Sequence, residues 1–333
     1  MTQNFIEVNN ISKSFRIHKH GSGFAGAVKD IFHPAYERKK AVDDVSFSIK
    51  EGEMVGFIGP NGAGKSTTVK MLSGILYPDS GKIQVAGYIP YRQRKEYVAN
   101  IGVVFGQKSQ ISWDLSPLDS YEVIRHIYRI PPKKYKENLE RYTELLDMGC
   151  FLHQPVRQLS LGQRMRADIA AALLHSPKIV FFDEPTIGID VVGKDKIRRF
   201  IKTLNQTDNI TMIFTTHDMQ DIEKTCERLI IIDGGKKLYD GSLENVRKVY
   251  VSSRIIEAEF ESLPISLNLP HTVISDVENN ALKKRISFRT DEVSVNELMT
   301  ALMNTRNIKD LSIREPEIDA IIRDIYEGKI ILN

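Results

Sequence analysis

Apolar residues in the central part of the chain fall into short uninterrupted runs, separated by longer stretches with helical spacing. The runs are typical of buried parallel strands, and they cover residues 54–57, 101–105, 179–182, 211–215 and 229–232. Helices are predicted between them, over residues 66–75, 135–148 and 163–174. Gly149 follows the second helix as a C-terminal stop. Strands that alternate with helices predict an α/β fold with a parallel sheet.

The two ends of the chain have different patterns. Residues 6–8 and 45–49 predict short strands near the N-terminus. Between them, Phe24, Val28, Ile31 and Phe32 predict one face of a short helix. From about residue 246 the pattern predicts half-exposed strands and two helices, over residues 254–260, 272–277, 281–288, 295–303, 311–313 and 317–326. We therefore expect a small C-terminal α+β domain over residues 246–333, after a first domain over residues 1–245.

Composition narrows the class of protein. The chain has 333 residues, enough for about two domains, and its 41% hydrophobic and 27% charged residues exclude wholesale disorder. A net charge of +3 gives no support for nucleic-acid binding through bulk charge. Cys150 and Cys226 lie far apart, which suits a reducing compartment. No apolar run approaches the roughly 18–20 residues of a spanning helix, and no signal pattern is present. We expect a protein in the cytosol or on the cytosolic face of a membrane.

Residues 16–40 form a basic insertion. It contains six basic and two acidic residues, a net charge of +4, so the positive excess of the chain lies here. Its cationic and aromatic composition suits anionic lipid headgroups or a membrane protein partner. A solvated charged loop is an equally good interpretation, because charged surface stretches are common.

The strongest chemical signal is a glycine-rich run with the pattern G-x-x-x-x-G-K-[ST], which reads Gly59-Pro60-Asn61-Gly62-Ala63-Gly64-Lys65-Ser66. Glycines allow successive backbone N–H groups to point at phosphate oxygens, and the helix that follows presents its positive end to the same anion. Lys65 is expected to reach the β- and γ-phosphates, and the Ser66 hydroxyl to ligate Mg²⁺. A chance glycine-rich turn needs neither a strand before it nor a helix after it, so the run predicts a nucleoside-triphosphate site.

Two carboxylates, Asp183 and Glu184, end the apolar run at residues 179–182. Charged groups at the end of a buried strand are costly unless something nearby needs negative charge. Asp183 suits Mg²⁺, bound directly or in its second coordination sphere, and Glu184 suits polarising the water that attacks the γ-phosphorus. The alternative is a solvated turn, since Asp-Glu-Pro is also good turn chemistry. The phosphate loop in the same chain favours the functional interpretation.

A third sequence stands just before the helix predicted at residues 163–174, and it reads Leu159-Ser160-Leu161-Gly162-Gln163. Together with the phosphate loop and the acidic strand end, in this order, it resembles the LSGGQ signature of ATP-binding cassette (ABC) transporter ATPases. The resemblance covers about residues 4–245. It implies a P-loop NTPase core of the ABC type with a helical subdomain at about residues 108–165. Leu161 departs from the pattern, which has glycine there, and a side chain at this position can limit how closely the backbone approaches a phosphate.

The resemblance assigns further residues to the site. Gln107 is similar to the Q-loop glutamine that contacts Mg²⁺ or the attacking water, His217 to the switch histidine, and Asp190 to the D-loop aspartate. Phe15 resembles the aromatic residue that stacks on adenine, although burial for area alone explains an aromatic there equally well. The expected catalytic residues are Glu184, His217, Gln107 and Lys65, and the expected Mg²⁺ ligands are Ser66, Gln107 and Asp183. The expected nucleotide-binding residues are Phe15, Gly59, Pro60, Asn61, Gly62, Ala63, Gly64, Lys65, Ser66, Thr67, Ser160, Gly162, Gln163 and Asp190.

In this family two subunits pair head to tail, and each ATP lies between the phosphate loop of one and the signature of the other. The resemblance therefore implies an ATPase that uses ATP and Mg²⁺, pairs with a second copy and powers a separate integral membrane permease from the cytoplasmic side of the cell membrane. Among family members, it is most similar to exporters of drugs, antibiotics or polymers. The alternative is a soluble ABC-superfamily ATPase with a non-transport macromolecular partner. The usual second cassette or long coiled coil of such proteins is absent from this sequence.

Overall fold

The computed structural model describes residues 4–18, 36–106, 108–248, 253–262, 269, 271–277, 280–304, 308–314 and 318–328. The chain divides into two compact units, Met1–Gly241 and Ser242–Asn333. Among the described residues, no helix combines the length and the hydropathy needed to cross a membrane. The helix expected around Phe24 and Phe32 lies outside the described residues.

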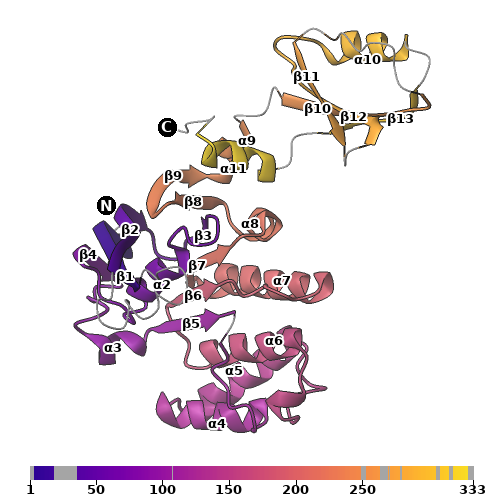
Figure 1. Ribbon diagram of the computed structural model, residues 1–333. Coiled ribbons are helices and arrows are strands. Elements are labelled where there is room, and N and C mark those ends of the chain that lie inside the picture. Colours follow the sequence, from indigo (N-terminus) through magenta and orange to yellow (C-terminus); the bar gives the residue numbers. More distant parts are fainter. Residues whose placement is uncertain are drawn as a thin grey trace, which may run out of the picture. The chain divides into compact units, whose positions relative to one another are not determined.

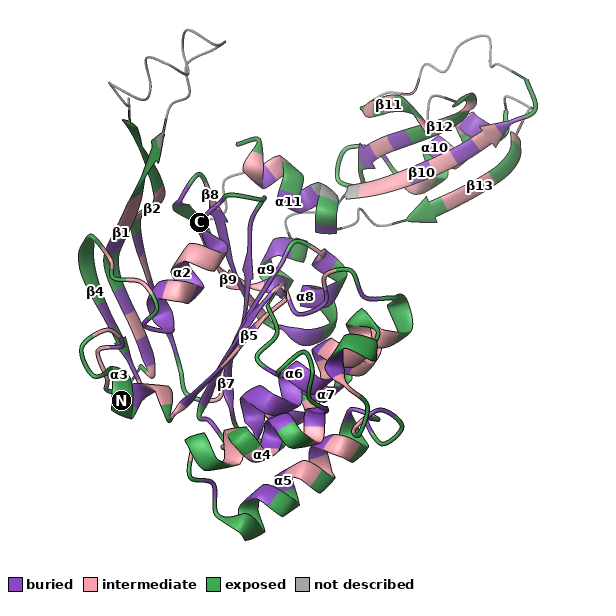
Figure 2. Cartoon of the chain, turned by 60° about the horizontal axis from the view of Figure 1, so that its bottom comes forward, coloured by how far each residue is buried: buried purple, intermediate pink, exposed green. Residues whose placement is uncertain are grey.

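A six-stranded sheet forms the centre of the first unit, with the order β5-β6-β7-β3-β8-β9. Five of its strands pair in parallel, as the uninterrupted apolar runs predict. Their bounds are β3 Met54–Ile58, β5 Ile101–Phe105, β6 Ile179–Asp183, β7 Thr211–Thr216 and β8 Arg228–Asp233, followed by β9 Lys236–Ser242. Every residue of β3, β6 and β7 is buried, and Figure 2 shows β7 among the buried strands in the interior of the unit.

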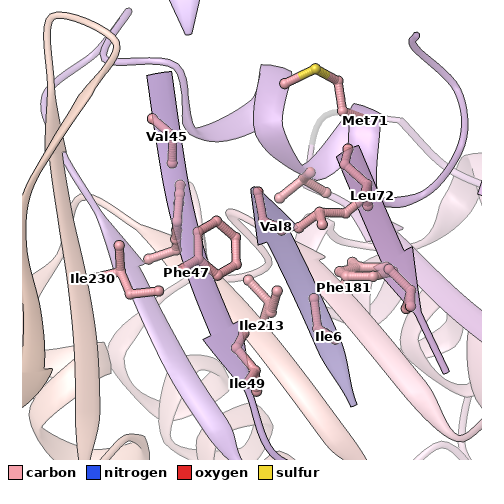
Figure 3. Close-up of a cluster of buried hydrophobic side chains, with 14 of the residues drawn as sticks. Ile6, Val8, Val45, Phe47, Ile49, Met71, Leu72, Phe181, Ile213 and Ile230 are labelled. Carbon is pink, nitrogen blue, oxygen red and sulfur yellow. The ribbon is translucent and has the colours of Figure 1, made fainter. Parts of the chain in front are cut away.

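A second, antiparallel sheet has the order β2-β1-β4. Its strands are β1 Ile6–His18, β2 Tyr36–Ile49 and β4 Ser80–Val85. The strands expected at residues 6–8 and 45–49 are therefore only the buried ends of longer strands. Apolar side chains of this sheet pack on the six-stranded sheet and on helix α2, Lys65–Leu72. Figure 3 shows part of this cluster: Ile6, Val8, Phe47 and Ile49 of the antiparallel sheet, Met71 and Leu72 of α2, and Phe181, Ile213 and Ile230 of the six-stranded sheet.

Helices flank the six-stranded sheet, and α4, α5 and α6 gather beside β5 (Figure 1). The helices of this unit are α2 Lys65–Leu72, α3 Arg94–Val98, α4 Pro117–Ile127, α5 Pro132–Leu145, the 3₁₀ turn Val156–Gln158, α6 Leu161–Leu173, α7 Val191–Asp208 and α8 Met219–Thr225. The expectation that Gly149 stops α5 is wrong. The helix ends at Leu145, and Asp147 takes the left-handed conformation just after it, with φ of 51°.

The second unit contains a four-stranded antiparallel sheet with the order β11-β12-β10-β13. Its elements are α9 Leu243–Lys248, β10 Ser253–Phe260, β11 Thr272–Val277, β12 Asn280–Arg289, α10 Val295–Met303, β13 Ile308–Arg314 and α11 Ile318–Tyr326. Alternate residues Ile256, Ala258 and Phe260 face a core shared with Leu298 and Leu302 of α10. Strands with one buried face explain the weak apolar pattern of this region, and its α+β class is confirmed.

Candidate functional site

The phosphate loop connects β3 to α2. Gly64 stands immediately before the first residue of α2 and has φ of 109°, in the left-handed region. A Cβ atom on Gly64 would lie 2.3 Å from the carbonyl oxygen of Ala41. Glycine is therefore required here both by the backbone conformation and by the close approach of the neighbouring strand.

Lys65, the first residue of α2, folds back over the loop. Its Nζ donates to the carbonyl oxygens of Gly59 at 2.5 Å and Pro60 at 3.2 Å, and it lies 3.9 Å from Oε1 of Glu184. Burial lowers the pKa of the Lys65 ammonium, and the carboxylates of Glu184 and Asp183 oppose this shift. The buried cation thus lies between the loop and the acidic strand end, where it can attract a polyphosphate.

Asp183, at the end of β6, meets Ser66 of α2. Its Oδ1 accepts hydrogen bonds from Ser66 Oγ at 3.0 Å and from Thr215 Oγ1 at 2.8 Å. A hydroxyl and a carboxylate are the oxygen donors that Mg²⁺ prefers in sites completed by phosphates and water. The two residues therefore fit a magnesium ion. Thr215 was not predicted from the sequence as a site residue. Its place in Thr215-Thr216-His217, at the end of a buried strand, is a signal that could have identified it.

Glu184 and His217 lie side by side at the ends of β6 and β7. The Nδ1 atom of His217 is 3.6 Å from Oε1 of Glu184. Glu184 has φ of 55°, a left-handed conformation that is strained for a residue with a side chain. Its amide donates to both the carbonyl and the hydroxyl oxygen of Thr215 at 3.1 Å. A Cβ atom on Gly106 would lie 2.1 Å from the Glu184 carbonyl oxygen, so glycine is needed at the end of β5 as well.

Ser66, Asp183, Glu184 and His217 line one pocket of about 420 Å³. Its lining comes from the phosphate loop, α2 and the ends of β5, β6 and β7, and consists of Asn61, Ser66, Lys70, Ile75, Phe105, Gly106, Lys108, Asp183, Glu184, Ile187 and His217. Gln107 lies outside the described residues, while its neighbours Gly106 and Lys108 line the pocket. Lys70 and Lys108 were not predicted, and no spacing rule in the sequence distinguishes them from surface lysines.

The signature residues do not line this pocket. Ser160 caps α6: its Oγ accepts from the amide of Gln163 at 3.2 Å, and its own amide donates to Gln163 Oε1 at 2.8 Å. Leu161 is 41% exposed. Its side chain contacts the loop after β6 at Gly188, where an added Cβ atom would lie 2.9 Å from Leu161 Cδ2. The leucine side chain thus packs against its own chain.

Two further predicted residues are also outside the pocket lining. Asp190 caps α7 by accepting from the amide of Gly193 at 2.7 Å. Phe15 is 39% exposed on β1, with Lys13 Nζ 6.0 Å from its ring centre. The predicted site residues therefore divide into a group gathered around the pocket and a group on other surfaces of the same chain.

Comparison with known proteins gives consistent matches. The family model described as ABC transporter matches residues 42–187. The ABC transporter ATP-binding protein NatA of Bacillus subtilis is 34% identical over 207 residues, 62% of this chain and 84% of that protein. The linearmycin resistance ATP-binding protein LnrL of Bacillus subtilis is 31% identical over 297 residues, 87% of this chain and 95% of that protein. The dimeric post-hydrolysis structure of the ATP-binding cassette MJ0796, bound to ADP and Pi, is similar with a TM-score of 0.60 and 26% identity, covering 72% of this chain and 98% of that one.

Proposed function

The chain belongs to the ATP-binding proteins of ABC transporters and is an ATPase that binds ATP, and we propose that two copies pair head to tail around two ATP molecules. The separation of the predicted residues supports this arrangement. The pocket is lined by Asn61 and Ser66 of the phosphate-loop motif and by Asp183, Glu184 and His217. Ser160 stands at the exposed start of α6, outside the pocket lining. The positive end of this 13-residue helix is an anion-binding group that a second copy can use.

Within each site, the side chains around the pocket take distinct roles. Lys65 binds the β- and γ-phosphates, and Ser66 and Asp183 hold Mg²⁺ together with Gln107; the metal neutralises charge on the phosphates when it is bound. Glu184 accepts a proton from the attacking water. His217, beside Glu184, donates a hydrogen bond from its imidazole N–H to the γ-phosphate.

We also propose that the protein powers a separate membrane permease from the cytoplasmic side and that transport is outward. The similarity to LnrL, whose name denotes resistance to linearmycin, supports export. The basic insertion at residues 16–40 supports contact with a membrane surface or with the permease. In its described part, Arg16, Arg38 and Lys39 are exposed on the paired ends of β1 and β2 (Figure 2).

The proposed domain organisation follows the same assignment. Residues 1–245 form the nucleotide-binding domain, with the helical subdomain at about residues 108–165, and residues 246–333 form an accessory domain.

Nucleotide-dependent pairing tests the proposal. The full-length Glu184→Gln variant keeps its phosphate-binding groups but loses the base, so it should bind ATP and remain paired. We expect light scattering to show a dimer with saturating ATP and Mg²⁺, and a monomer with ADP. Adding Ser160→Arg places a cation and a bulky side chain at the start of α6, and this double variant should bind ATP as a monomer. A Glu184→Gln protein that stays monomeric with ATP, even with the permease supplied, contradicts the proposal.

A further inference from the structure

A buried ionic network joins the two loops that carry Glu184 and His217. At its centre is Asp221 of α8, whose Oδ2 accepts hydrogen bonds from Thr186 Oγ1 at 2.5 Å and from Thr216 Oγ1 at 3.1 Å. Arg198 of α7 binds the other oxygen: its Nε donates to Oδ1 at 2.5 Å, and Nη2 also pairs with that atom. Each of these four residues is at most 4% exposed.

The two threonines of the network stand close in sequence to the two proposed catalytic residues. Thr186 follows Glu184 by two residues, and Thr216 immediately precedes His217. One rigid carboxylate therefore reaches both loops through hydroxyl groups at the base of each. Glu184 needs such support, because its left-handed backbone, with φ of 55°, persists only where surrounding contacts hold it.

Arg198 compensates the buried charge of Asp221. A buried carboxylate without a cation and hydrogen-bond donors is unfavourable, and here the guanidinium and two hydroxyls supply both. Arg198 also pairs with Asp195 at 3.2 Å and lies 3.8 Å from Asp218, which caps α8. Asp218 in turn pairs with Lys194 Nζ at 2.6 Å. The network thus ties α7 and α8 to the ends of β6 and β7.

We propose that Asp221 is a positioning residue for ATP hydrolysis. With its charge compensated by Arg198, its carboxylate sets the separation between the Glu184 carboxylate and the His217 imidazole through Thr186 and Thr216. The proposal rests on the catalytic roles proposed above for Glu184 and His217. Because the four residues are buried and are not among the residues that line the pocket, they act on geometry and do not touch the nucleotide.

Removing one hydroxyl tests the network with little change in shape. Thr186→Val is nearly isosteric and should lower kcat by roughly 10- to 100-fold, the range for a small misplacement of reacting groups, with the Kd for ATP unchanged. Thr186→Ser keeps the hydroxyl and should restore most of the rate. Thr225→Val is the matched control. Thr225 is also buried on α8 and donates to the Asp221 backbone oxygen at 2.5 Å, but it lies in neither catalytic loop. Its kcat should stay near that of the natural protein.

A double variant separates positioning from general stability. In the full-length Glu184→Gln background, Thr186→Val should cause no further loss of rate, because the group it positions is already gone. An equal loss in both backgrounds, an unchanged kcat in Thr186→Val, or the same loss in Thr225→Val overturns the proposal. The two proposals fail in different ways. Normal turnover in Glu184→Gln alone removes the role of Glu184 and this inference with it, whereas slow turnover in Glu184→Gln with normal turnover in Thr186→Val removes only the positioning role.

Discussion

Thr215 has a buried hydroxyl that contacts both acidic residues of the site, through the Asp183 carboxylate and the Glu184 backbone amide, so Thr215→Val is an informative perturbation. Its Oγ1 donates to Asp183 at 2.8 Å and accepts from the Glu184 amide at 3.1 Å. A hydrogen bond to a charged group contributes about 1.5–3 kcal/mol. Asp183 retains Ser66 as a donor, and the Glu184 amide retains the Thr215 carbonyl. We therefore expect a loss near the lower end of this range, about 2 kcal/mol of unfolding free energy.

The assay combines thermal unfolding with steady-state ATP hydrolysis. For a unit of this size, about 2 kcal/mol corresponds to a fall in Tm of roughly 4–8 °C, and kcat should fall about 10-fold or more because Asp183 and Glu184 lose a common support. Thr211→Val is the matched control. It lies at the other end of β7, is fully buried, and accepts from the Gly52 amide at 2.9 Å. This control should lose stability but keep its kcat. Equal effects of both variants on kcat would refute the assigned role of Thr215.

Three further predictions concern single residues. Lys65→Ala should weaken ATP binding by roughly 10- to 100-fold, the equivalent of one charged hydrogen bond, and an unchanged Kd in calorimetric titration would contradict the assignment. Burial lowers the pKa of His175 to about 4 from 6.5, so protonation favours the unfolded chain as the pH falls through this interval. Between pH 7 and pH 5 this group should remove about 2 kcal/mol of unfolding free energy, and His175→Phe should abolish that part of the decline in urea unfolding. Leu161→Gly should not raise the ATPase rate, because Leu161 leans on Gly188 of its own chain; a faster variant would mean that the side chain screens the Gly162 amide.

Most of the central sheet was predictable because its strands are buried on both faces. The runs at β5, β6 and β7 match the structure to within one residue. The second sheet was predicted only in part, since the far ends of β1 and β2 are exposed and carry no apolar alternation. The end of α5 was mispredicted because Asp147 takes the left-handed conformation that glycine usually supplies. The catalytic, binding and metal roles of the predicted site residues stay predictions that the variants above test.

The sequence by itself determined the phosphate loop, the acidic strand end and the class of fold, because each depends on residues adjacent in the chain or repeating at a strand or helix period. Only the tertiary structure decided what supports these groups. Asp221 binds Thr186 across 35 positions, and Thr215 binds Asp183 across 32. Gly106, which follows β5, leaves room for the carbonyl oxygen of Glu184, which follows β6. Such contacts form where parallel strands end at one edge of a sheet, and no local spacing encodes which side chains meet there.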